Sequence, residues 1–391
     1  MQDIVILGGK RTAIGTFGGA FAGTTPIALG AAVARAALDD SAVAPEQIGT
    51  VVYGHIINTE PRDMYLSRVA AMEAGIPETV PAMNVNRLCG SGLQAIVSAA
   101  QALSLGDADF ALAGGAECMS RSPYIVPQAR WGAKMGDVVG QDMMLGALNC
   151  PFGTGHMGVT AENVAAEHGV SREDQDAFAL ESQERAARAI EAGFFDREIV
   201  PVDVKIKRDM VPFTRDEHPK STSLEKLASL RPAFQKGGTV TAGNASGIND
   251  GAAALVLARA DTAQAAGLTP RARILGHAVA GVRPDVMGIG PVPAVEKLCA
   301  RTGLSVSDFD VVESNEAFAA QAIAVNRALG LDPVRVNPNG GAIALGHPVG
   351  ASGAIIAIKA LHELERTGGS KALVTMCIGG GQGIAVAFER V

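Results

Sequence analysis

The sequence predicts an α/β protein made of two similar halves, each a sheet with helices on its faces. Apolar strands alternate with alanine-rich helices, and one order of elements occurs twice, at a spacing of about 260 residues. The composition agrees, because glycine is abundant (47 residues) and aromatic residues are only 4% of the chain. Small aliphatic side chains must then fill the core, with glycine where backbones approach each other.

The first copy of the repeat begins with an alanine-rich helix over residues 26–38. An acidic turn and an apolar strand over residues 50–55 follow. In the second copy a helix ends near Leu298, and a strand over residues 311–315 lies 260 residues after the first strand. Apolar strands that alternate with helices are typical of a sheet covered on both faces.

A second helix and strand are also repeated, at a spacing of 261 residues. Cys89-Gly-Ser-Gly92 opens a helix that ends at Leu105, and Gly350-Ala-Ser-Gly353 opens one that ends at Leu364. Each helix precedes a strand that runs into glycines, over residues 110–115 and 373–380. The strand over residues 252–257 is assigned back to the first half.

An insertion with a different composition separates the halves. We expect one clear helix in it, residues 171–192, with Ser171 as its N-cap, and a basic, loop-like segment over residues 214–236. The predicted domains are a first half (1–118 and 248–270), an inserted loop domain (119–247) and a second half (271–391).

Composition and charge exclude several classes of protein. A chain of 391 residues that is 48% hydrophobic buries a large core, which excludes disorder. A net charge of −7 argues against a nucleic-acid partner. Five cysteines without a CxxC pair fit neither a disulfide scaffold nor a zinc site. We recognise no signal peptide and no membrane span, so we expect a cytoplasmic protein.

Cys89 lies where a helix begins, and glycines flank it. Unpaired backbone N–H groups and the helix dipole favour a thiolate at such a position, so Cys89 is a candidate nucleophile. The alternative is a small buried hydrophobic residue, as most free cysteines are.

His347 precedes the matching helix of the second half, and the repeat places it at the same end of the fold as Cys89. An imidazole there could take the thiol proton or stabilise an oxyanion, or it could simply cap the loop.

Cys377 and Asn315 each lie where a predicted strand ends, which is where α/β proteins place ligands. Cys377 could shuttle a proton or be a core residue. Asn315 could hold a water or an oxyanion, or form a turn. The glycines after Cys377 fail the GxGxxG spacing and precede a strand, so they are no dinucleotide motif.

Four motifs, in this order, resemble those of the thiolase family: Asn86-Arg-Leu-Cys89-Gly-Ser-Gly, Asn315-Glu-Ala-Phe, Gly346-His347-Pro-Val-Gly-Ala-Ser-Gly and Cys377-Ile-Gly-Gly-Gly-Gln-Gly. The resemblance extends from Arg11 to the final strand. Within the family the chain is similar to bacterial acetyl-CoA acetyltransferases and broad-range β-ketothiolases of polyhydroxyalkanoate-forming bacteria. It implies a thiolase-like fold of duplicated five-stranded halves in α-β-α-β-α layers with an inserted loop domain, and a homotetramer (a dimer of dimers).

The resemblance also implies the activity: reversible Claisen condensation of two acyl-CoA molecules, or thiolysis of 3-ketoacyl-CoA, by a ping-pong mechanism on acetoacetyl-CoA and other short-chain substrates. Cys89 would carry the acyl group, His347 would activate it, and Cys377 would be the acid/base at the α-carbon. One oxyanion site would join His347 to a water held by Asn315. The other would use the backbone N–H groups of Cys89 and Gly379.

Coenzyme A and acyl-CoA are implied as substrates, with no metal and no permanently bound cofactor. The inserted domain would hold the pantetheine arm, and the matching positions for substrate are Leu148, His156, Met157, Lys220, Ala242, Ser246, Met287 and Phe318. The two methionines could line an acyl pocket or fill core gaps. The candidates for the coenzyme phosphates are basic residues that could equally form a solvated face: Arg215, His218, Lys220 and Lys226.

Two other functions fit the same fold class. A decarboxylating ketosynthase that acts with acyl carrier protein would have a histidine or asparagine where Cys377 stands, which favours the thiolase interpretation. A non-enzymatic coenzyme A-binding protein would be expected to lack at least one catalytic residue, and all are present. The physiological direction and the range of acyl chain lengths stay open.

Overall fold

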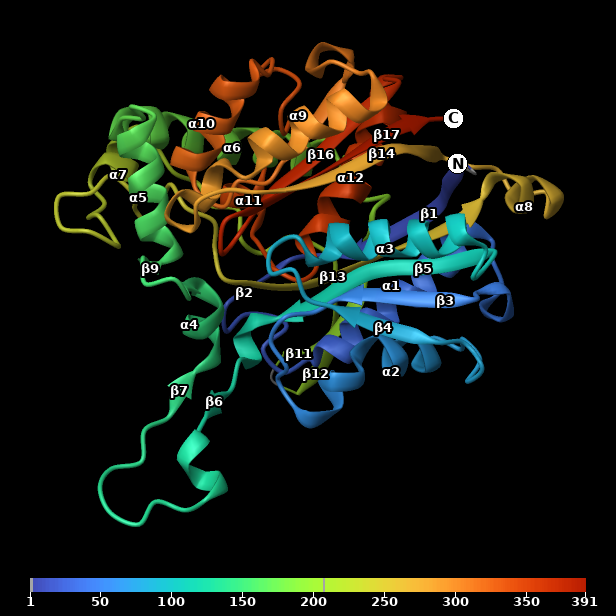
Figure 1. Cartoon of the computed structure of the whole chain (residues 1–391), viewed down its shortest axis with the longest axis horizontal. Coiled ribbons are helices and arrows are strands. Elements are labelled where there is room, and N and C mark those ends of the chain that lie inside the picture. Colours follow the sequence, from blue (N-terminus) through green and yellow to red (C-terminus); the bar gives the residue numbers. More distant parts are fainter. Residues whose placement is uncertain (1–2, 207) are drawn as a thin grey trace.

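The computed structural model describes residues 3–206 and 208–391 as five layers (Figure 1). Helices α1 (Pro26–Ser41) and α2 (Leu66–Glu73) cover the outer face of the first sheet region. Helices α3 (Ser91–Leu105) and α12 (Ser352–Thr367) pack together between the sheet regions, and α9 (Pro291–Thr302) covers the other outer face. The predicted α-β-α-β-α layering is confirmed.

The first half contributes five strands, in the order β4 (Ala82–Val85), β3 (Thr50–Gly54), β5 (Phe110–Cys118), β13 (Asn249–Arg259) and β1 (Ile4–Thr12). The second half contributes β14 (Ala272–Gly281), β17 (Gln382–Arg390), β16 (Lys371–Ile378) and β15 (Val311–Ser314). Two residue pairs between β1 and β14 join the halves into one sheet.

The fifth strand position of the second half is a single parallel bridge between Val312 and Val336. The next residue, Asn337, has a φ of 44°, and this left-handed conformation turns the chain away from the sheet. The first half therefore has the predicted five strands. The second half has four strands, and the bridge at Val336 stands in place of the fifth.

The repeat is visible in the strand register. Val51 pairs with Leu112 in parallel, and Val311 pairs with Ala372 in the same way. Both pairs are offset by 260 residues, as the sequence predicts. The predicted helices and strands of the halves are all present, with ends shifted by a few residues.

The two central helices touch backbone to backbone. A Cβ atom at Gly353 would lie 2.3 Å from the Leu93 nitrogen, and one at Gly92 would lie 2.8 Å from the Ala354 nitrogen. The window Leu88–Leu105 is apolar and long enough to cross a membrane, the only such helix within residues 3–206 and 208–391. It contains α3, which lies in the core between the sheet regions, and buried core helices pass the same test.

The insertion adds two longer helices, α5 (Met157–Glu167) and α6 (Arg172–Glu191). The Ser171 side chain accepts a hydrogen bond from the Asp174 nitrogen (3.0 Å), so the predicted helix and its N-cap are confirmed. The segment predicted as a loop contains a short helix, α7 (Leu224–Ala228), which Ser223 caps. A single turn has too little apolar periodicity to be recognised in a sequence.

The remaining elements are short or peripheral. The strands are β2 (Gly15–Thr16), β6 (Tyr124–Ile125), β7 (Gln141–Asp142), β8 (Asn149–Cys150), β9 (Gly155–His156), β10 (Ile199–Val200), β11 (Val202–Ile206) and β12 (Asp209–Phe213). The helices are α4 (Met143–Leu148), α8 (Ala260–Ala265), α10 (Ala319–Leu329) and α11 (Ala342–Leu345).

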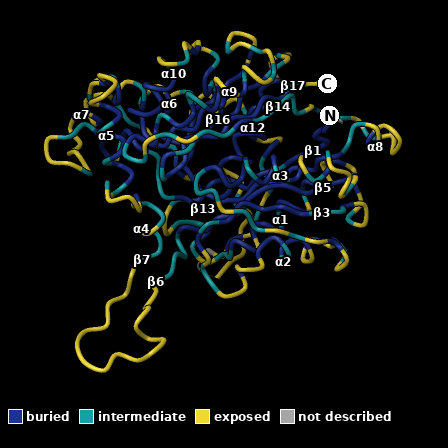
Figure 2. Tube along the Cα trace, viewed as in Figure 1, coloured by how far each residue is buried: buried dark blue, intermediate teal, exposed yellow. Residues whose placement is uncertain are grey.

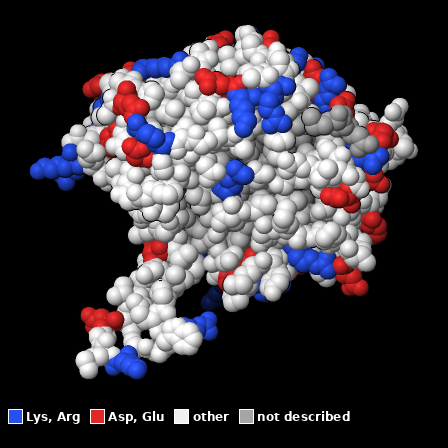
Figure 3. Space-filling model, viewed as in Figure 1, with Lys and Arg blue, Asp and Glu red and all other residues white. Residues whose placement is uncertain are grey.

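An arm between β6 and β7 projects from the body, and almost its entire length is exposed (Figures 1 and 2). Trp131 and Met135 near its tip are 88% and 97% exposed. Elsewhere on the face seen in Figure 3, charged side chains of both signs are interspersed over a mostly uncharged surface.

Candidate active site

A cavity of about 380 Å³ lies where the two halves and the insertion meet. Cys89, His347 and Gly379 form part of its wall. All the positions proposed for substrate also line it: Leu148, His156, Met157, Lys220, Ala242, Ser246, Met287 and Phe318. The fold therefore brings together residues that are far apart in the sequence.

Cys89 lies two residues before the first residue of α3, in a loop held by its own side chains. Leu88 has a φ of 43°, and its nitrogen donates to Asn86 Oδ1 (3.0 Å). The Ser91 hydroxyl accepts from the Arg87 nitrogen (2.9 Å) and donates to the Leu88 carbonyl (2.6 Å). These bonds fix the direction in which the Cys89 side chain leaves the backbone.

Burial raises the pKa of the Cys89 thiol above its ordinary value. The backbone N–H groups of Gly379 and of Cys89 itself act in the opposite direction with smaller effect. The backbone N–H groups therefore favour the thiolate as expected, but desolvation of the charged form outweighs them. The resting group is a thiol, and it needs a base.

The His347 imidazole has the surroundings that a base requires. Its Nδ1 lies 2.7 Å from the Ser352 hydroxyl, which is also 2.9 Å from the Pro348 carbonyl. If the hydroxyl proton goes to that carbonyl, Nδ1 carries the imidazole proton and donates it to Ser352. Nε2 is then a free base, and it is buried without a partner in the described chain. Burial lowers the pKa of His347 to about 4, so the imidazole is neutral at physiological pH.

The His347 backbone is also fixed, because its nitrogen donates to Asn249 Oδ1 (2.9 Å). Sequence reasoning missed both Ser352 and Asn249 as residues that position the imidazole. The Gly-Ala-Ser-Gly motif contained a signal for Ser352, since a hydroxyl in the first turn of a helix often bonds to the preceding loop.

Cys377 and Asn315 do not line the cavity, although Cys377 packs in one apolar cluster with Met157, Met287 and Phe318, which do. Cys377 is fully buried near the end of β16, and burial together with the neighbouring Cys89 raises its pKa. Asn315 is 2% exposed, and within the described residues neither its Oδ1 nor its Nδ2 has a hydrogen-bond partner.

An aromatic stack forms another part of the wall. Phe234 lies parallel to the His156 ring (centroids 4.6 Å apart) and edge-on to Phe318 (6.1 Å). Sequence reasoning missed Phe234, although a phenylalanine within a charged loop was a signal that it packs against something. Met157 and Met287 belong to the same apolar cluster as Phe318 and Cys377.

The basic loop contributes less charge than expected. Lys220 lines the cavity, but Arg215 and Lys226 are exposed and do not. His218 also lines it, yet burial and nearby Lys220 lower its pKa to about 4. His218 is therefore neutral at physiological pH and adds no positive charge to the cavity.

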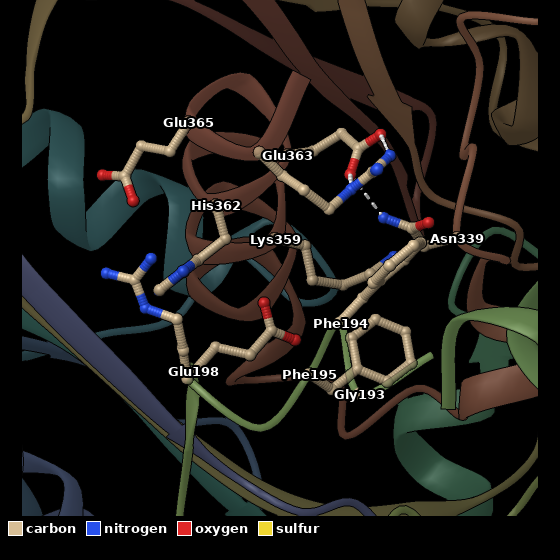
Figure 4. Close-up of a pocket in the computed structure, with 11 residues that line it drawn as sticks. Gly193, Phe194, Phe195, Glu198, Asn339, Lys359, His362, Glu363 and Glu365 are labelled. Carbon is tan, nitrogen blue, oxygen red and sulfur yellow. Dashed lines mark hydrogen bonds and ion pairs between the residues drawn. The ribbon is translucent and has the colours of Figure 1, made fainter. Parts of the chain in front are cut away.

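A second cavity, of about 230 Å³, lies beside α12 and is lined by charged side chains (Figure 4). Glu363 accepts from Asn339 (2.8 Å) and from Arg366 (2.8 Å), and the Lys359 ammonium group donates to Glu313 (2.9 Å). These ion pairs and hydrogen bonds tie α12 to its neighbours in the chain.

Comparisons with known proteins agree with this geometry. The family model "Thiolase, N-terminal domain" matches residues 4–261, and "Thiolase, C-terminal domain" matches residues 268–390. The chain is 58% identical to "Beta-ketothiolase BktB" of Cupriavidus necator and 49% identical to an "Acetyl-CoA acetyltransferase" of Escherichia coli, with 100% of both chains covered in each case.

Among solved structures, the acetyl-CoA acetyltransferase of Bacillus anthracis superposes with a TM-score of 0.98 at 45% identity, covering 100% of this chain and 99% of that one. Human mitochondrial 3-ketoacyl-CoA thiolase in complex with CoA superposes with a TM-score of 0.97 at 44% identity, covering 100% and 98%. The chain therefore belongs to the thiolase family and is an acyltransferase.

Proposed function

We propose that the chain interconverts 3-ketoacyl-CoA plus CoA with two acyl-CoA molecules through an acyl group carried on Cys89. One observation carries the proposal: a single cavity is lined by a thiol, by an unprotonated imidazole and by a glycine-rich turn whose backbone N–H reaches the sulfur. These are the nucleophile, base and oxyanion donor of acyl transfer.

In the direction of thiolysis, His347 Nε2 takes the Cys89 proton and the sulfur attacks the keto carbon of the substrate. The oxyanion is stabilised by the backbone N–H groups of Cys89 and Gly379. The bond between the α-carbon and the keto carbon then breaks. The acyl group stays on Cys89, and the electron pair goes to the acetyl-CoA enolate.

The enolate oxygen is held by the protonated His347 and by a water on Asn315, whose two side-chain polar atoms are free for it. Cys377 gives its proton to the α-carbon, and acetyl-CoA leaves. The raised pKa of Cys377 suits this step, because the group enters it as a thiol.

The second half-reaction restores the enzyme. An incoming CoA thiol gives its proton to Cys377 and attacks the acyl group, and Cys89 leaves as a thiolate that regains its proton from His347. Condensation is the same sequence in reverse. Every proton taken is returned, so the cycle needs no cofactor.

The substrates proposed are acetoacetyl-CoA and other short-chain 3-ketoacyl-CoA thioesters. The inserted domain, residues 119–247, holds the pantetheine arm, and Lys220 is the candidate for a coenzyme phosphate. Apolar side chains of Met157, Met287 and Phe318 surround the acyl group. The human thiolase solved with CoA supports a coenzyme site in this cavity.

We also propose a cytoplasmic homotetramer, a dimer of dimers. The projecting arm supports it, since an exposed hairpin with an apolar tip gains stability only by contact with another surface.

The test of the proposed function is Cys89→Ala. We expect thiolysis of acetoacetyl-CoA to fall at least about 1,000-fold, because no other group can carry the acyl chain. The matched control is Cys299→Ala, which removes a partly exposed thiol on α9 that lines no part of the cavity and should leave the rate unchanged. Full thiolysis by Cys89→Ala would show that the acyl group is carried elsewhere.

A further inference from the structure

A buried carboxylate that the proposed mechanism does not use lies at the end of β5. Glu117 is fully buried and accepts hydrogen bonds from the backbone nitrogens of Ile56 and Ile57 (3.1 Å each). His55 lies beside it, with Nδ1 3.5 Å from Glu117 Oε1 and 2.9 Å from the Ala116 carbonyl. A buried carboxylate is costly unless it is paired, so its retention calls for a reason.

The register of the two halves gives Glu117 a counterpart. From the equivalent pairs Val51–Leu112 and Val311–Ala372, the offset of 260 residues places Glu117 where Cys377 stands in the second half. The partner strands agree, because Glu117 pairs with Gly251 of β13 and Cys377 pairs with Gly383 of β17.

The same offset places His55 at the position of Asn315. The first half therefore has a carboxylate and an imidazole where the second half has the proposed acid/base thiol and the proposed water-binding amide.

Glu117 also reaches across to the second half. The Gly350 backbone packs against its carboxylate, since a Cβ atom at Gly350 would lie 2.4 Å from Glu117 Oε2, and the Gly350 N–H acts to lower the pKa of Glu117 against the larger effect of burial. Gly350 follows His347 by three residues, and Ile56, on the other side of Glu117, lines the cavity. One carboxylate thus joins the His347 loop to the end of β3.

The Gly350 carbonyl is packed tightly against the backbone of the first half, so Gly350 cannot shift without a clash. Cβ atoms at three glycines of the first half would lie within 3.0 Å of it: Gly54 (2.5 Å), Gly92 (3.0 Å) and Gly115 (2.2 Å). Gly92 follows Cys89 by three residues. The loops that carry the sulfur and the imidazole are therefore set against each other at this point, and a shift of Gly350 would move His347 relative to Cys89.

We propose that Glu117 is a positioning residue, which holds the His347 loop against the end of β3 and so sets the separation of the imidazole from the Cys89 sulfur. This inference rests on the proposed roles of Cys89 and His347. The Glu117 charge has a second effect, because it contributes to the raised pKa of Cys89. The ionisable groups near the sulfur are Glu117, Cys377 and, on the cavity wall, His347.

The test uses two substitutions that separate charge from position. Glu117→Gln keeps the size, but its amide nitrogen cannot accept from the backbone N–H groups. We expect kcat for thiolysis to fall about 10- to 100-fold, as for a small misplacement of reacting groups, with KM for CoA within about twofold. The pH midpoint for alkylation of Cys89 by iodoacetamide should move to lower pH, because the negative charge of Glu117 is gone.

Glu117→Asp keeps the negative charge, but its shorter side chain does not reach the same backbone N–H groups. We therefore expect kcat to fall while the pH midpoint for alkylation stays at the wild-type value.

The control is Asp40→Asn, which alters a carboxylate that also accepts a backbone N–H (Gly9, 3.0 Å) and faces cations but lines no part of the main cavity. It should keep wild-type kcat and the wild-type alkylation midpoint. The value of kcat is calculated from the concentration of folded protein. That concentration is measured by circular dichroism and by complete labelling of Cys89. If Glu117→Gln does not fold, Glu117→Asp alone decides the matter.

Wild-type kcat in the folded Glu117 variants would overturn the positioning role, and so would a loss explained entirely by unfolded protein. These results are distinguishable from failure of the proposed function. Activity in Cys89→Ala would remove the nucleophile, whereas an inactive Cys89→Ala beside fully active Glu117 variants would remove only the role of Glu117.

Discussion

At the residue scale, the surroundings of two thiols support the different roles proposed for them. Burial raises the pKa of both Cys89 and Cys377, so both are thiols at rest. Only Cys89 lines the cavity together with the His347 imidazole. Cys377 is not on the cavity wall but neighbours Cys89 and packs with Met157, Met287 and Phe318, which are, so the proposed acid/base role places it next to the α-carbon of the bound substrate.

Cys377→Ser tests this division. The hydroxyl is a much weaker acid and base than the thiol, so we expect α-proton exchange of acetyl-CoA to fall at least about 100-fold. The acetyl group should still be transferred to Cys89. Exchange is measured by NMR in D₂O and the acetyl-enzyme by mass spectrometry. Normal exchange would assign the acid/base role to another group.

The sequence predicted the chemical groups of the site better than their surroundings. Cys89, His347 and the wall residues are recognisable from motifs, because the chemistry depends on the residue type. The net direction of the Cys89 pKa shift and the lowered pKa of His218 were not predictable from the motifs. Both depend on burial by segments far away in the sequence, which no local pattern contains.

At the element scale, the arm between β6 and β7 is the segment with the least support from its own chain. Its tip exposes Trp131 and Met135, and short two-stranded hairpins are marginally stable alone. The arm therefore supports the proposed homotetramer.

Trp131→Ser combined with Met135→Ser should convert the proposed tetramer into dimers, because it removes the apolar contact area of the arm. The mass measured by light scattering after size-exclusion chromatography would fall by half. The control is Val334→Ser, which changes an exposed apolar residue (77%) outside the arm and should leave the mass unchanged. A double variant of full mass would place the contact elsewhere.

Elements of the repeated halves were predictable because long apolar strands and alanine-rich helices have a clear period. The hairpin of β11 and β12 and the single turn of α7 were not. The bridge at Val336 was not predictable either, because the left-handed conformation of Asn337 is imposed by its contacts: its side chain accepts from the Ser314 nitrogen (2.9 Å) and donates to Glu316 (2.9 Å).

At the scale of the whole molecule, buried histidines make stability depend on pH. The pKa values of His218 and His347 are lowered to about 4 by burial, against about 6.5 in an unfolded chain. Below pH 6.5 the unfolded chain therefore binds protons that the folded protein does not. The contribution of these two histidines to the free energy of unfolding therefore falls as the pH drops from about 6.5 to about 4, while Glu313, whose pKa burial raises to about 7, acts in the opposite direction.

His218→Gln removes one of these groups and should make that fall smaller, by up to about 3 kcal/mol. The comparison is urea unfolding of the variant and the wild type at pH 7.0 and pH 4.5. The variant should lose less stability than the wild type between the two. Equal losses would show that His218 is protonated as easily in the folded protein as in the unfolded chain.

The duplicated architecture was predictable from the spacing of about 260 residues, but the way the halves meet was not. The contact of Gly350 with Gly54, Gly92 and Gly115 depends on backbones approaching closely enough to exclude any side chain. A sequence shows that glycines are present. It does not show which of them face one another.

The division of the site between the two halves also governs how it comes into being. Cys89 is made early, whereas the strand β16 that covers it and the loop that carries His347 are made last. At about 5–20 residues per second, the ribosome needs roughly 15–60 s to supply them. During that interval the thiol belongs to an incomplete chain without its base and without its cover. We therefore expect newly made protein to be open to oxidants at Cys89, the residue proposed to carry the acyl group.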